Sequence, residues 1–307
     1  MAYYNILGGV LRGLGDSVSA LLYLLIATIV NIVLDILFVA SFGSGVAGVA
    51  LATAIAQALS AVLCFWNLLR MSDIFDMKKK YLKLHRKYAI TTIRLGLPSG
   101  LTQAIFSMAM IIVQSLTNSF GEMFIAANVI VMRVDGFAMM PNFSFGTAMT
   151  TYAGQNVGAH ELERVDEGAK QGTFIAMGVS ITALILIFGK YLMGIFTDTS
   201  ELVDMSMRMM RILAVGYVAM AVTQSLSGVM RGAGDTMTPM WISLITTVGI
   251  RVPVAYGIAY LTRSEQYPGG RCESIFFSLL FSWTLGAVVT FICYRWGKWK
   301  QKAIESV

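Results

Sequence analysis

The chain has 307 residues, of which 56% are hydrophobic and 13% charged, and its mean hydropathy is +0.69. Soluble domains carry about twice that charged fraction, so the composition excludes an ordinary soluble protein and predicts an all-α polytopic membrane protein. The net charge of +6 could suggest nucleic-acid binding, but the basic residues lie in short loops beside apolar segments, where they orient a membrane protein. We therefore expect the lipid bilayer, and no nucleic acid, as a partner.

Eight segments are apolar over the roughly 20 residues that a helix needs to cross a bilayer. They lie at residues 18–41, 46–69, 89–116, 123–150, 170–195, 205–229, 237–261 and 273–296. Residues 1–11 read as the end of one further span. Most of the lysine and arginine residues fall on one side of this arrangement, including those of the 70–87 segment and of the closing YRWGKWKQK. The positive-inside rule assigns that side to the cytoplasm.

An internal repeat relates two turns of the sequence. LRGLGD at 11–16 and MRGAGD at 230–235 each follow one apolar run and precede another. Glycine permits the tight turn and the aspartate can cap the next helix. The residues assigned to these structural turns are Arg12, Gly13, Gly15, Asp16, Arg231, Gly232, Gly234 and Asp235. Because both turns lie on the same side and lead in the same direction, they predict a parallel repeat of two lobes.

The repeat also predicts how much of a first lobe this sequence contains. The second lobe begins near residue 89, and its turn follows at 230. The same separation places the start of the first lobe about 130 residues before Met1, which corresponds to three spans and most of a fourth. We therefore expect twelve helices in the whole arrangement, of which eight and the end of another are visible.

Two polar residues interrupt the first apolar span. Asn31 and Asp35 are four residues apart and so share one helix face. Asp35 and Thr53 each lie nine residues from Ser44, which places them at similar depth in a helical hairpin. A carboxylate costs about 2.5–3.5 kcal/mol at the centre of a membrane helix. These hard oxygen donors suit a small hard cation or a proton.

Hydrogen bonding between helices is the alternative role for this pair, with an average contribution of about 0.6 kcal/mol per contact. The repeat offers a comparison, because Ile250 and Val254 occupy the corresponding positions of the second lobe and both are apolar. A purely structural pair would be expected in both lobes. The comparison therefore favours an ion site confined to the first lobe.

Several motifs together resemble the multidrug and toxic compound extrusion (MATE) family over nearly the whole chain. They are the two turns, NIVLD at 31–35, GVAGVALATAIAQ at 45–57, RLGLPSG at 94–100 and YAGQNVGA at 152–159. The resemblance implies a two-lobed bundle of twelve helices that expels cationic or amphipathic drugs and metabolites in exchange for Na⁺ or H⁺. It places residues 1–70 in the N-lobe (end of helix 4, helices 5 and 6), 71–88 in a cytoplasmic basic linker, 89–296 in the C-lobe (helices 7–12) and 297–307 in a cytoplasmic tail.

The resemblance to the DinF-like branch of this family also implies a cation site at Asn31, Asp35 and Thr53, with Na⁺ as the only metal expected. The further aspartate of that branch lies on the first helix, which this sequence does not contain. The expected location is the plasma membrane, here a bacterial inner membrane, with several passes and the linker 71–88 and the C-terminus in the cytoplasm. We expect a monomer.

A substrate cleft is the second site predicted. Its candidate residues are Asp135, Gln103, Met139 and Met140. Flexible thioethers suit varied ligands, and a carboxylate attracts cations. Two structural alternatives remain open, namely an internal ion pair between Asp135 and Arg251 and hydrogen bonding of Gln103 to a neighbouring helix.

An enzyme is not expected. His85 and His160 lie in loops without a catalytic partner, and the cysteines, Cys64, Cys272 and Cys293, show no metal or disulfide spacing. The chain has no G-x-x-x-x-G-K-[ST] nucleotide motif and should need no cofactor beyond a coupling ion. Two alternatives to drug antiport are a flippase for lipid-linked sugars or polyisoprenoids and an inactive, truncated remnant.

Overall fold

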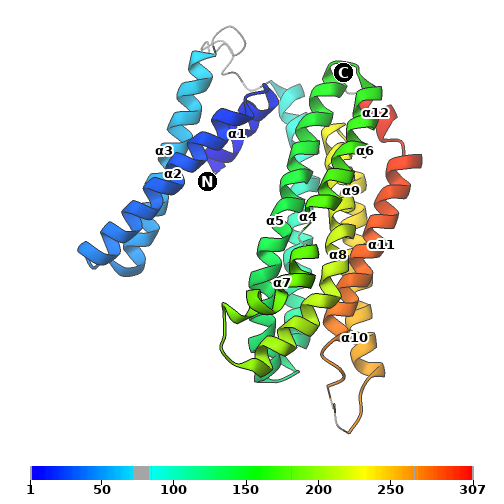
Figure 1. Ribbon diagram of the computed structural model, residues 1–307. Coiled ribbons are helices and arrows are strands. Elements are labelled where there is room, and N and C mark those ends of the chain that lie inside the picture. The colour runs from blue at the N-terminus through cyan, green and yellow to red at the C-terminus, as the bar shows by residue number, and fades with distance from the viewer. Residues whose placement is uncertain are drawn as a thin grey trace. The chain divides into compact units, whose positions relative to one another are not determined.

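A computed structural model describes residues 2–71, 83, 85–180, 182–265, 267 and 269–305. In these ranges the chain folds into helices, without strands (Figure 1). The helices are α1 (Ala2–Gly13), α2 (Ser17–Ile36), α3 (Gly45–Arg70), α4 (Arg86–Asn118), α5 (Glu122–Gly158), α6 (Leu162–Val179), α7 (Thr182–Gly194), α8 (Ser200–Gly232), α9 (Met237–Ser243), α10 (Arg251–Leu261), α11 (Ser274–Trp296) and α12 (Trp299–Glu305). Two π-helical segments, η1 (Leu37–Ser41) and η3 (Leu244–Ile250), extend α2 and join α9 to α10.

Seven helical runs in the described part of the chain are long and apolar enough to cross a membrane. They are Ser17–Ser41, Gly45–Arg70, Arg86–Asn118, Glu122–Gly158, Ser200–Gly232, Met237–Leu261 and Ser274–Trp296. The chain is therefore an all-α, multi-pass membrane protein, as its composition predicts.

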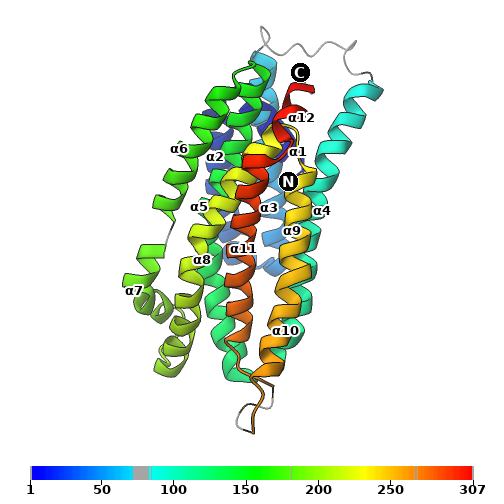
Figure 2. The same cartoon turned by 90° about the vertical axis from the view of Figure 1, so that its right-hand side faces the viewer.

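The fifth predicted span, 170–195, is wrong as a continuous helix. The structure divides this segment between α6 and α7, and Figure 2 shows the break. Ser180 ends α6 with an extended backbone (ψ 136°), and its hydroxyl donates to the carbonyl of Met177 at 2.8 Å. A serine that bonds its own preceding turn competes with the helical ladder, and Gly178 weakens the helix further. The apolar composition alone does not reveal this interruption.

The chain divides into two compact units, residues 1–86 and 87–307. The first unit contains α1, α2 and α3, and its α2–α3 hairpin turns at Gly43, whose φ of +62° is readily adopted only by glycine. Its core consists of Tyr4, Leu11, Ala20, Cys64 and Leu68. Of the predicted linker 71–88, residues 72–82 and 84 lie outside the described residues.

The two repeated turns have the same backbone hydrogen bonds. Gly15 and Gly234 have φ of +95° and +88°, and each donates its N–H to an arginine carbonyl, that of Arg12 at 3.1 Å and that of Arg231 at 3.0 Å. These are the left-handed helix ends for which glycine is favoured. Gly13 and Gly232 each end the helix before the turn.

In the second unit α8 lies at the centre and packs against α5, α6, α7 and α11 (Figure 1). Glycines bring α5 and α8 into backbone contact: a Cβ on Gly228 would lie 2.4 Å from the carbonyl oxygen of Gly146. A Cβ on Gly232 would lie 2.3 Å from the carbonyl oxygen of Thr150. Small residues allow such close approach where the surrounding lipid offers helices little hydrophobic drive to associate.

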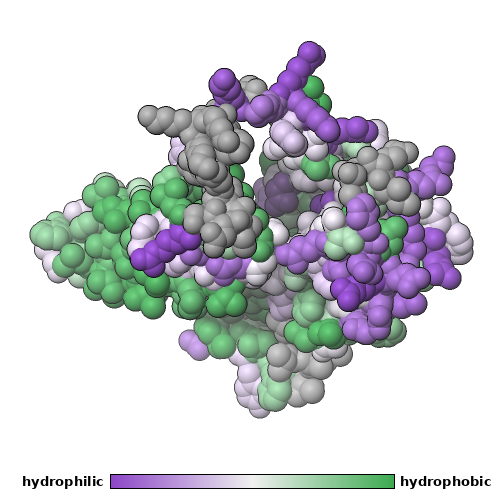
Figure 3. Space-filling model, turned by 90° about the horizontal axis from the view of Figure 1, so that it is seen from above, coloured by the Kyte–Doolittle hydropathy of each residue, from purple (hydrophilic) through white to green (hydrophobic). Residues whose placement is uncertain are grey.

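The predicted tail, 297–307, contains α12, which packs on the second unit. Trp299 is buried, stacks on Tyr294 with ring centroids 5.1 Å apart, and donates its indole N–H to the Tyr294 carbonyl at 2.7 Å. Lys300 forms an ion pair with Asp166 of α6. Figure 3 shows hydrophilic side chains gathered on the end of this unit where α12 lies.

Candidate functional site

The first candidate site lies in the α2–α3 hairpin of the first unit. α2 carries Asn31 and Asp35, and α3 carries Thr53. At one end of the hairpin, Asn67 Nδ2 donates to Asp16 Oδ2 at 2.9 Å. At the other end the turn at 42–44 closes the pair of helices. The three predicted residues occupy the half of the hairpin nearer this turn, and all three are half-buried.

Two of the predicted residues have buried polar atoms without a hydrogen-bond partner. Asn31 Nδ2 and Asp35 Oδ1 are both in this condition, and so is Oε1 of Gln57 on α3. Each buried, unsatisfied polar atom costs about 1–3 kcal/mol. Since two of the three are acceptor oxygens, a cation or a proton would satisfy them. Rotation of the Asn31 amide can present its oxygen in the same way.

Gln57 is a site residue that the predicted set lacks. It follows Thr53 by four residues and so lies on the same face of α3. Thr53 donates its hydroxyl to the carbonyl of Val49 at 2.9 Å, which leaves the lone pairs of Oγ1 free. The i, i+4 spacing of Thr53 and Gln57 repeats that of Asn31 and Asp35, and this symmetry of the two helices is the signal that could have revealed Gln57.

The four side chains suit a hard monovalent cation. They supply one carboxylate, two amides and one hydroxyl, which are the oxygen ligands that hard cations prefer. The described part of the chain contains no group of three or more His, Cys, Asp or Glu residues placed to hold a metal ion. A single carboxylate with neutral donors also allows the alternative in which Asp35 takes up a proton.

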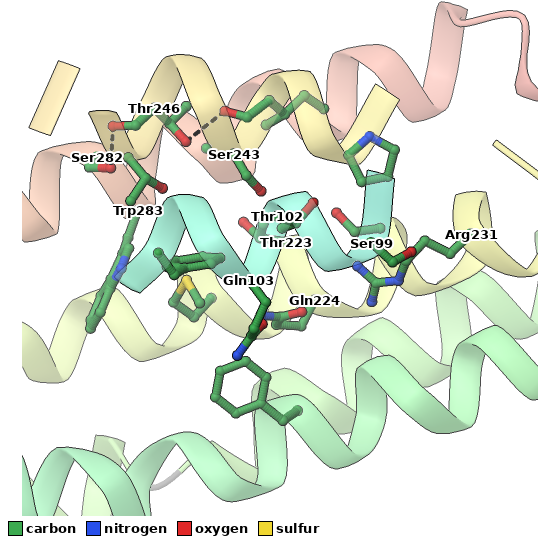
Figure 4. Close-up of a pocket in the computed structure, with 18 of the residues that line it drawn as sticks. Ser99, Thr102, Gln103, Thr223, Gln224, Arg231, Ser243, Thr246, Ser282 and Trp283 are labelled. Atoms are coloured by element: carbon green, nitrogen blue, oxygen red, sulfur yellow. Dashed lines mark hydrogen bonds between the residues drawn. The ribbon is translucent and has the colours of Figure 1, made fainter. Parts of the chain in front are cut away.

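The second candidate site is a cavity of about 240 Å³ inside the second unit. Helices α4, α5, α8, α9 and α11 and segment η3 contribute to it (Figure 4). Gln103, one of the residues predicted for a substrate cleft, lines this cavity. Three aromatic rings, of Phe106, Phe143 and Trp283, line the same space. Aromatic faces can bind the apolar parts of a ligand and, through their electron density, a cationic group.

Most of the polar lining consists of hydroxyl groups, and several of them donate their hydrogen to a backbone carbonyl. Thr102, Thr223 and Thr246 donate to the backbone carbonyls of Pro98, Ala219 and Ile242 at 2.9, 3.0 and 2.8 Å. Ser282 donates to the carbonyl of Thr246 at 2.7 Å (Figure 4). A hydroxyl that donates to the backbone presents lone pairs to the cavity. The lining therefore offers acceptors to a ligand that carries N–H or O–H groups.

Among these lining residues, the sequence predicted a role in substrate binding only for Gln103. The signal is a polar stripe on each helix, namely Ser99, Thr102 and Gln103 on α4, Thr223, Gln224 and Ser227 on α8, and Ser243, Thr246 and Thr247 near η3. Spacings of three and four residues put each stripe on one helix face. Arg231, from the second turn motif, is the one charged residue among the described residues of this lining.

Asp135 lies in a different, smaller cavity of about 70 Å³. Arg251 lines the same cavity, but no ion pair within 4.0 Å joins these two described side chains. Tyr217 of α8 donates its hydroxyl to Asp135 Oδ1 at 2.7 Å instead. The internal ion pair of Asp135 with Arg251, one of the two structural alternatives, is therefore not formed within 4.0 Å, and Tyr217 is the hydrogen-bond partner of Asp135.

The remaining predicted cleft residues are separated from these cavities. Met139 is buried in the core of the second unit, and Met140 is 59% exposed. Neither contributes to the cavities described above. Met139 points into the core and Met140 points away from it, because consecutive residues of a helix point about 100° apart.

The turn residues have a structural placement. Asp16 accepts the N–H of Ser19 at 3.0 Å, and Asp235 accepts the N–H of Thr238 at 3.3 Å. The bond from Ser19 is also the main reason why the pKa of Asp16 lies below its usual value. Both aspartates therefore cap the helix that follows them.

The fold and these sites define an all-helical, multi-pass membrane protein with polar cavities between its helices. The chain matches the MatE family model over residues 98–257, which is more than half of its length. It belongs to the multidrug and toxic compound extrusion (MATE) family of transporters.

Relatives from bacteria share this family. The probable multidrug resistance protein YpnP of Bacillus subtilis is 29% identical over 300 residues, which cover 97% of this chain and 65% of that protein. The probable multidrug resistance protein YoeA of the same organism is 28% identical over 264 residues, with 83% and 57% covered. The probable multidrug resistance protein NorM of Thermotoga maritima is 24% identical, with 97% and 64% covered. The chain thus spans 57% to 65% of the length of these relatives.

Solved structures share the fold. A MATE crystal structure in the bent conformation superposes with a TM-score of 0.86 at 23% identity. The superposition covers 99% of this chain and 66% of the chain in that crystal structure. The outward-facing conformation of a multidrug resistance MATE family transporter of the MOP superfamily gives a TM-score of 0.85 at 24% identity, with 99% and 67% covered.

Proposed function

We propose that the protein expels cationic or amphipathic small molecules across the plasma membrane in exchange for Na⁺ or H⁺. The observation that carries this proposal is the set of buried polar atoms without partners in the α2–α3 hairpin, Asn31 Nδ2, Asp35 Oδ1 and Gln57 Oε1. Such atoms cost stability unless a ligand satisfies them. Relatives that carry the name multidrug resistance protein support export of drug-like molecules.

The coupling step places the inward-moving cation in the first unit. Na⁺ neutralises the carboxylate of Asp35 and can be coordinated by the amide oxygens of Asn31 and Gln57. A proton neutralises Asp35 in the same way and allows it to donate a hydrogen bond to one of these oxygens. Once neutral, the site can close on one side of the membrane and open on the other. A bare carboxylate enclosed in the hydrocarbon region would cost several kcal/mol. Each inward elementary charge contributes about 2.3 kcal/mol per 100 mV of membrane potential.

The exported molecule binds in the second unit, in the cavity lined by Gln103. Rings of Phe106, Phe143 and Trp283 hold its apolar part. The hydroxyl oxygens of Thr102, Thr223 and Thr246 accept hydrogen bonds from its N–H or O–H groups. This lining is polar without a carboxylate, so it fits amphipathic molecules of varied shape. The protein acts as a monomer, with its basic side and C-terminus in the cytoplasm.

Efflux of an ethidium-type dye from proteoliposomes tests the proposal. An Na⁺ gradient and a pH gradient are imposed separately on the protein and on the Asp35→Asn variant. We expect efflux under at least one gradient and a loss of at least tenfold in the variant under that gradient. Asp198→Asn, which removes an exposed carboxylate from the loop after α7, is the matched control and should retain the full rate.

Two outcomes count against the proposal. If Asp35→Asn transports dye at the normal rate under both gradients, Asp35 does not couple the cation. If dye moves at the same rate without any gradient, the protein does not perform antiport. Movement of fluorescent lipid between leaflets under the same conditions would instead support the flippase alternative.

A further inference from the structure

A groove of about 590 Å³ lies on the second unit where α6, α8 and α11 meet. α8 forms its floor, and α6 and α11 form its walls. Phe174 on α6 and Phe291 on α11 line it and are 73% and 53% exposed. In a helix bundle that crosses a membrane, exposed rings at these positions face hydrocarbon. The occupant of the groove is therefore expected to be apolar along most of its length.

One end of the groove is positively charged. Lys170 of α6 precedes Phe174 by one helical turn, and Arg295 of α11 follows Phe291 by one turn. Since α6 and α11 run in opposite directions, both cations lie toward the same end. This is the end where Lys300 of α12 pairs with Asp166. The groove therefore has an apolar body and a cationic head.

The two cations have no anionic partner among the described residues. The ion pairs of this part of the chain join Lys300 to Asp166 and Lys190 to Asp204, and no carboxylate lines the groove. Nearby Glu167 accepts a hydrogen bond from Gln171 at 3.2 Å. The Asp166 carboxylate near this end is bound by Lys300 and by the hydroxyl of Tyr294, so Lys170 and Arg295 can bind an external anion.

A hydroxyl group adds a third polar contact. Thr173 Oγ1 is buried, has no hydrogen-bond partner and belongs to the lining of the groove. It lies three residues after Lys170, on the same face of α6. A buried hydroxyl without a partner costs about 1–3 kcal/mol, which a phosphate or ester oxygen of a ligand could recover.

The charged end lies at the expected level of lipid head groups. Trp296, next to Arg295, is 74% exposed. Tryptophan is enriched at membrane–water interfaces, and the basic side of this chain is the side expected in the cytoplasm. Anionic lipids attract basic residues at that surface.

We propose that this groove is a binding site for an anionic phospholipid. Its phosphate binds Lys170 and Arg295, whose guanidinium can hold two phosphate oxygens at once. An acyl chain follows Phe174, Met177 and Phe291 over the floor formed by Leu226. The proposal is independent of the transport proposed above, because it uses neither Asp35 nor the cavity of Gln103.

Native mass spectrometry of the full chain released from detergent tests this site. The retention of phosphatidylglycerol is measured for the protein and for Lys170→Gln/Arg295→Gln. Lys170 and Arg295 contact the phosphate directly in this proposal, and at about fivefold for each cation the double variant should bind about 25-fold more weakly. The matched control is Arg164→Gln/Lys298→Gln, which removes two exposed basic residues of the same side that do not line the groove. It should change binding less than twofold.

Two further ligands identify what the site recognises. Phosphatidylcholine has the same chains but no net charge and should bind equally weakly to the protein and to the double variant. Glycerol 1-phosphate has the phosphate without chains and should not be retained. Retention of glycerol 1-phosphate as strong as that of phosphatidylglycerol would overturn the lipid assignment in favour of a simple anion site.

The apolar part of the groove is tested separately. Phe174→Ser leaves both cations in place and should weaken phosphatidylglycerol retention at least threefold, while thermal unfolding shows that the variant remains folded. Equal phosphatidylglycerol retention in the protein, the charge variant and Phe174→Ser would overturn the proposal, and so would an equal loss in the Arg164→Gln/Lys298→Gln control.

Discussion

Asp16 and Asp235 occupy equivalent positions in the two units. The N–H of Asp16 donates to the carbonyl of Leu11, and the N–H of Asp235 donates to that of Met230, both at 2.9 Å. Each carboxylate then accepts the N–H of the residue three positions later. The repeat in the sequence is therefore a repeat of hydrogen bonds, in which one short motif ends one helix and begins the next.

Removing the first of these caps should destabilise the first unit. Asp16→Ala loses the bond from Ser19 and the bond from Asn67 of α3, so we expect a loss of about 1–2 kcal/mol in the free energy of unfolding. Asp16→Asn keeps one acceptor oxygen, which can take the bond from Ser19 while the bond from Asn67 is lost, so it should lose less than Asp16→Ala. Thermal unfolding of both variants in one detergent measures the difference, and equal losses would show that the cap does not depend on an acceptor at residue 16.

The same aspartate predicts a dependence on pH. The hydrogen bonds from Ser19, followed by that from Asn67, lower the pKa of Asp16 in the folded protein. In the unfolded chain the pKa of aspartate is about 3.9, and in the folded protein the pKa of Asp16 is lower. The stabilisation by Asp16 is therefore complete above the unfolded pKa and is lost as the pH falls through the folded pKa. The difference in Tm between the protein and Asp16→Ala should be constant from pH 5 to 8 and shrink below about pH 4. A difference that grows on acidification would contradict this assignment.

Gln57 should bind the coupling cation without stabilising the fold. Because its Oε1 is buried and has no partner, Gln57→Leu should leave Tm in cation-free buffer unchanged or raise it. Ligand binding to the folded state raises Tm, so the increase in Tm that Na⁺ produces should fall in Gln57→Leu and vanish in Asp35→Asn. Gln171→Leu, at an exposed position of α6, should keep the full increase. If Gln57→Leu retains it as well, Gln57 is not a ligand.

The contact between α5 and α8 should not tolerate a methyl group. A Cβ at Gly228 would lie 2.4 Å from a backbone oxygen of Gly146, and backbone cannot move aside as a side chain can. We expect Gly228→Ala to cost about 1–3 kcal/mol or more. Gly136→Ala adds the same methyl to α5, where no atom lies within 4 Å, and should stabilise slightly if anything. Similar unfolding temperatures for the two variants would contradict the close packing.

Removing only the hydroxyl group of Tyr217 should destabilise the second unit. Tyr217→Phe removes the 2.7 Å hydrogen bond to the carboxylate of Asp135, and a bond to a charged group contributes about 1.5–3 kcal/mol. Tyr256→Phe removes an exposed hydroxyl that donates to the carbonyl of Ile112 at 3.2 Å and should cost far less. Denaturation of both variants measures the two losses. If they are equal, Asp135 has another partner that replaces Tyr217.

Much of this molecule is local and therefore readable from its sequence. Membrane spans follow from apolar length, and the capped turns at Asp16 and Asp235 follow from glycine and aspartate chemistry within six residues. That Asn31 and Asp35 share one face of their helix follows from helical periodicity. Each of these depends on neighbours in the chain, so no tertiary contact is needed to recognise it.

Other features exist only because distant helices meet. The bond between Tyr217 and Asp135 joins residues 82 positions apart, and the orphaned Gln57 oxygen becomes notable only when α3 packs on α2. The cavity around Gln103 collects hydroxyls from five stretches of chain, none of which indicates a site by itself. Burial turns these ordinary polar residues into candidate ligands, because a polar atom removed from water and lipid alike must find its partner in the folded protein or in what that protein binds.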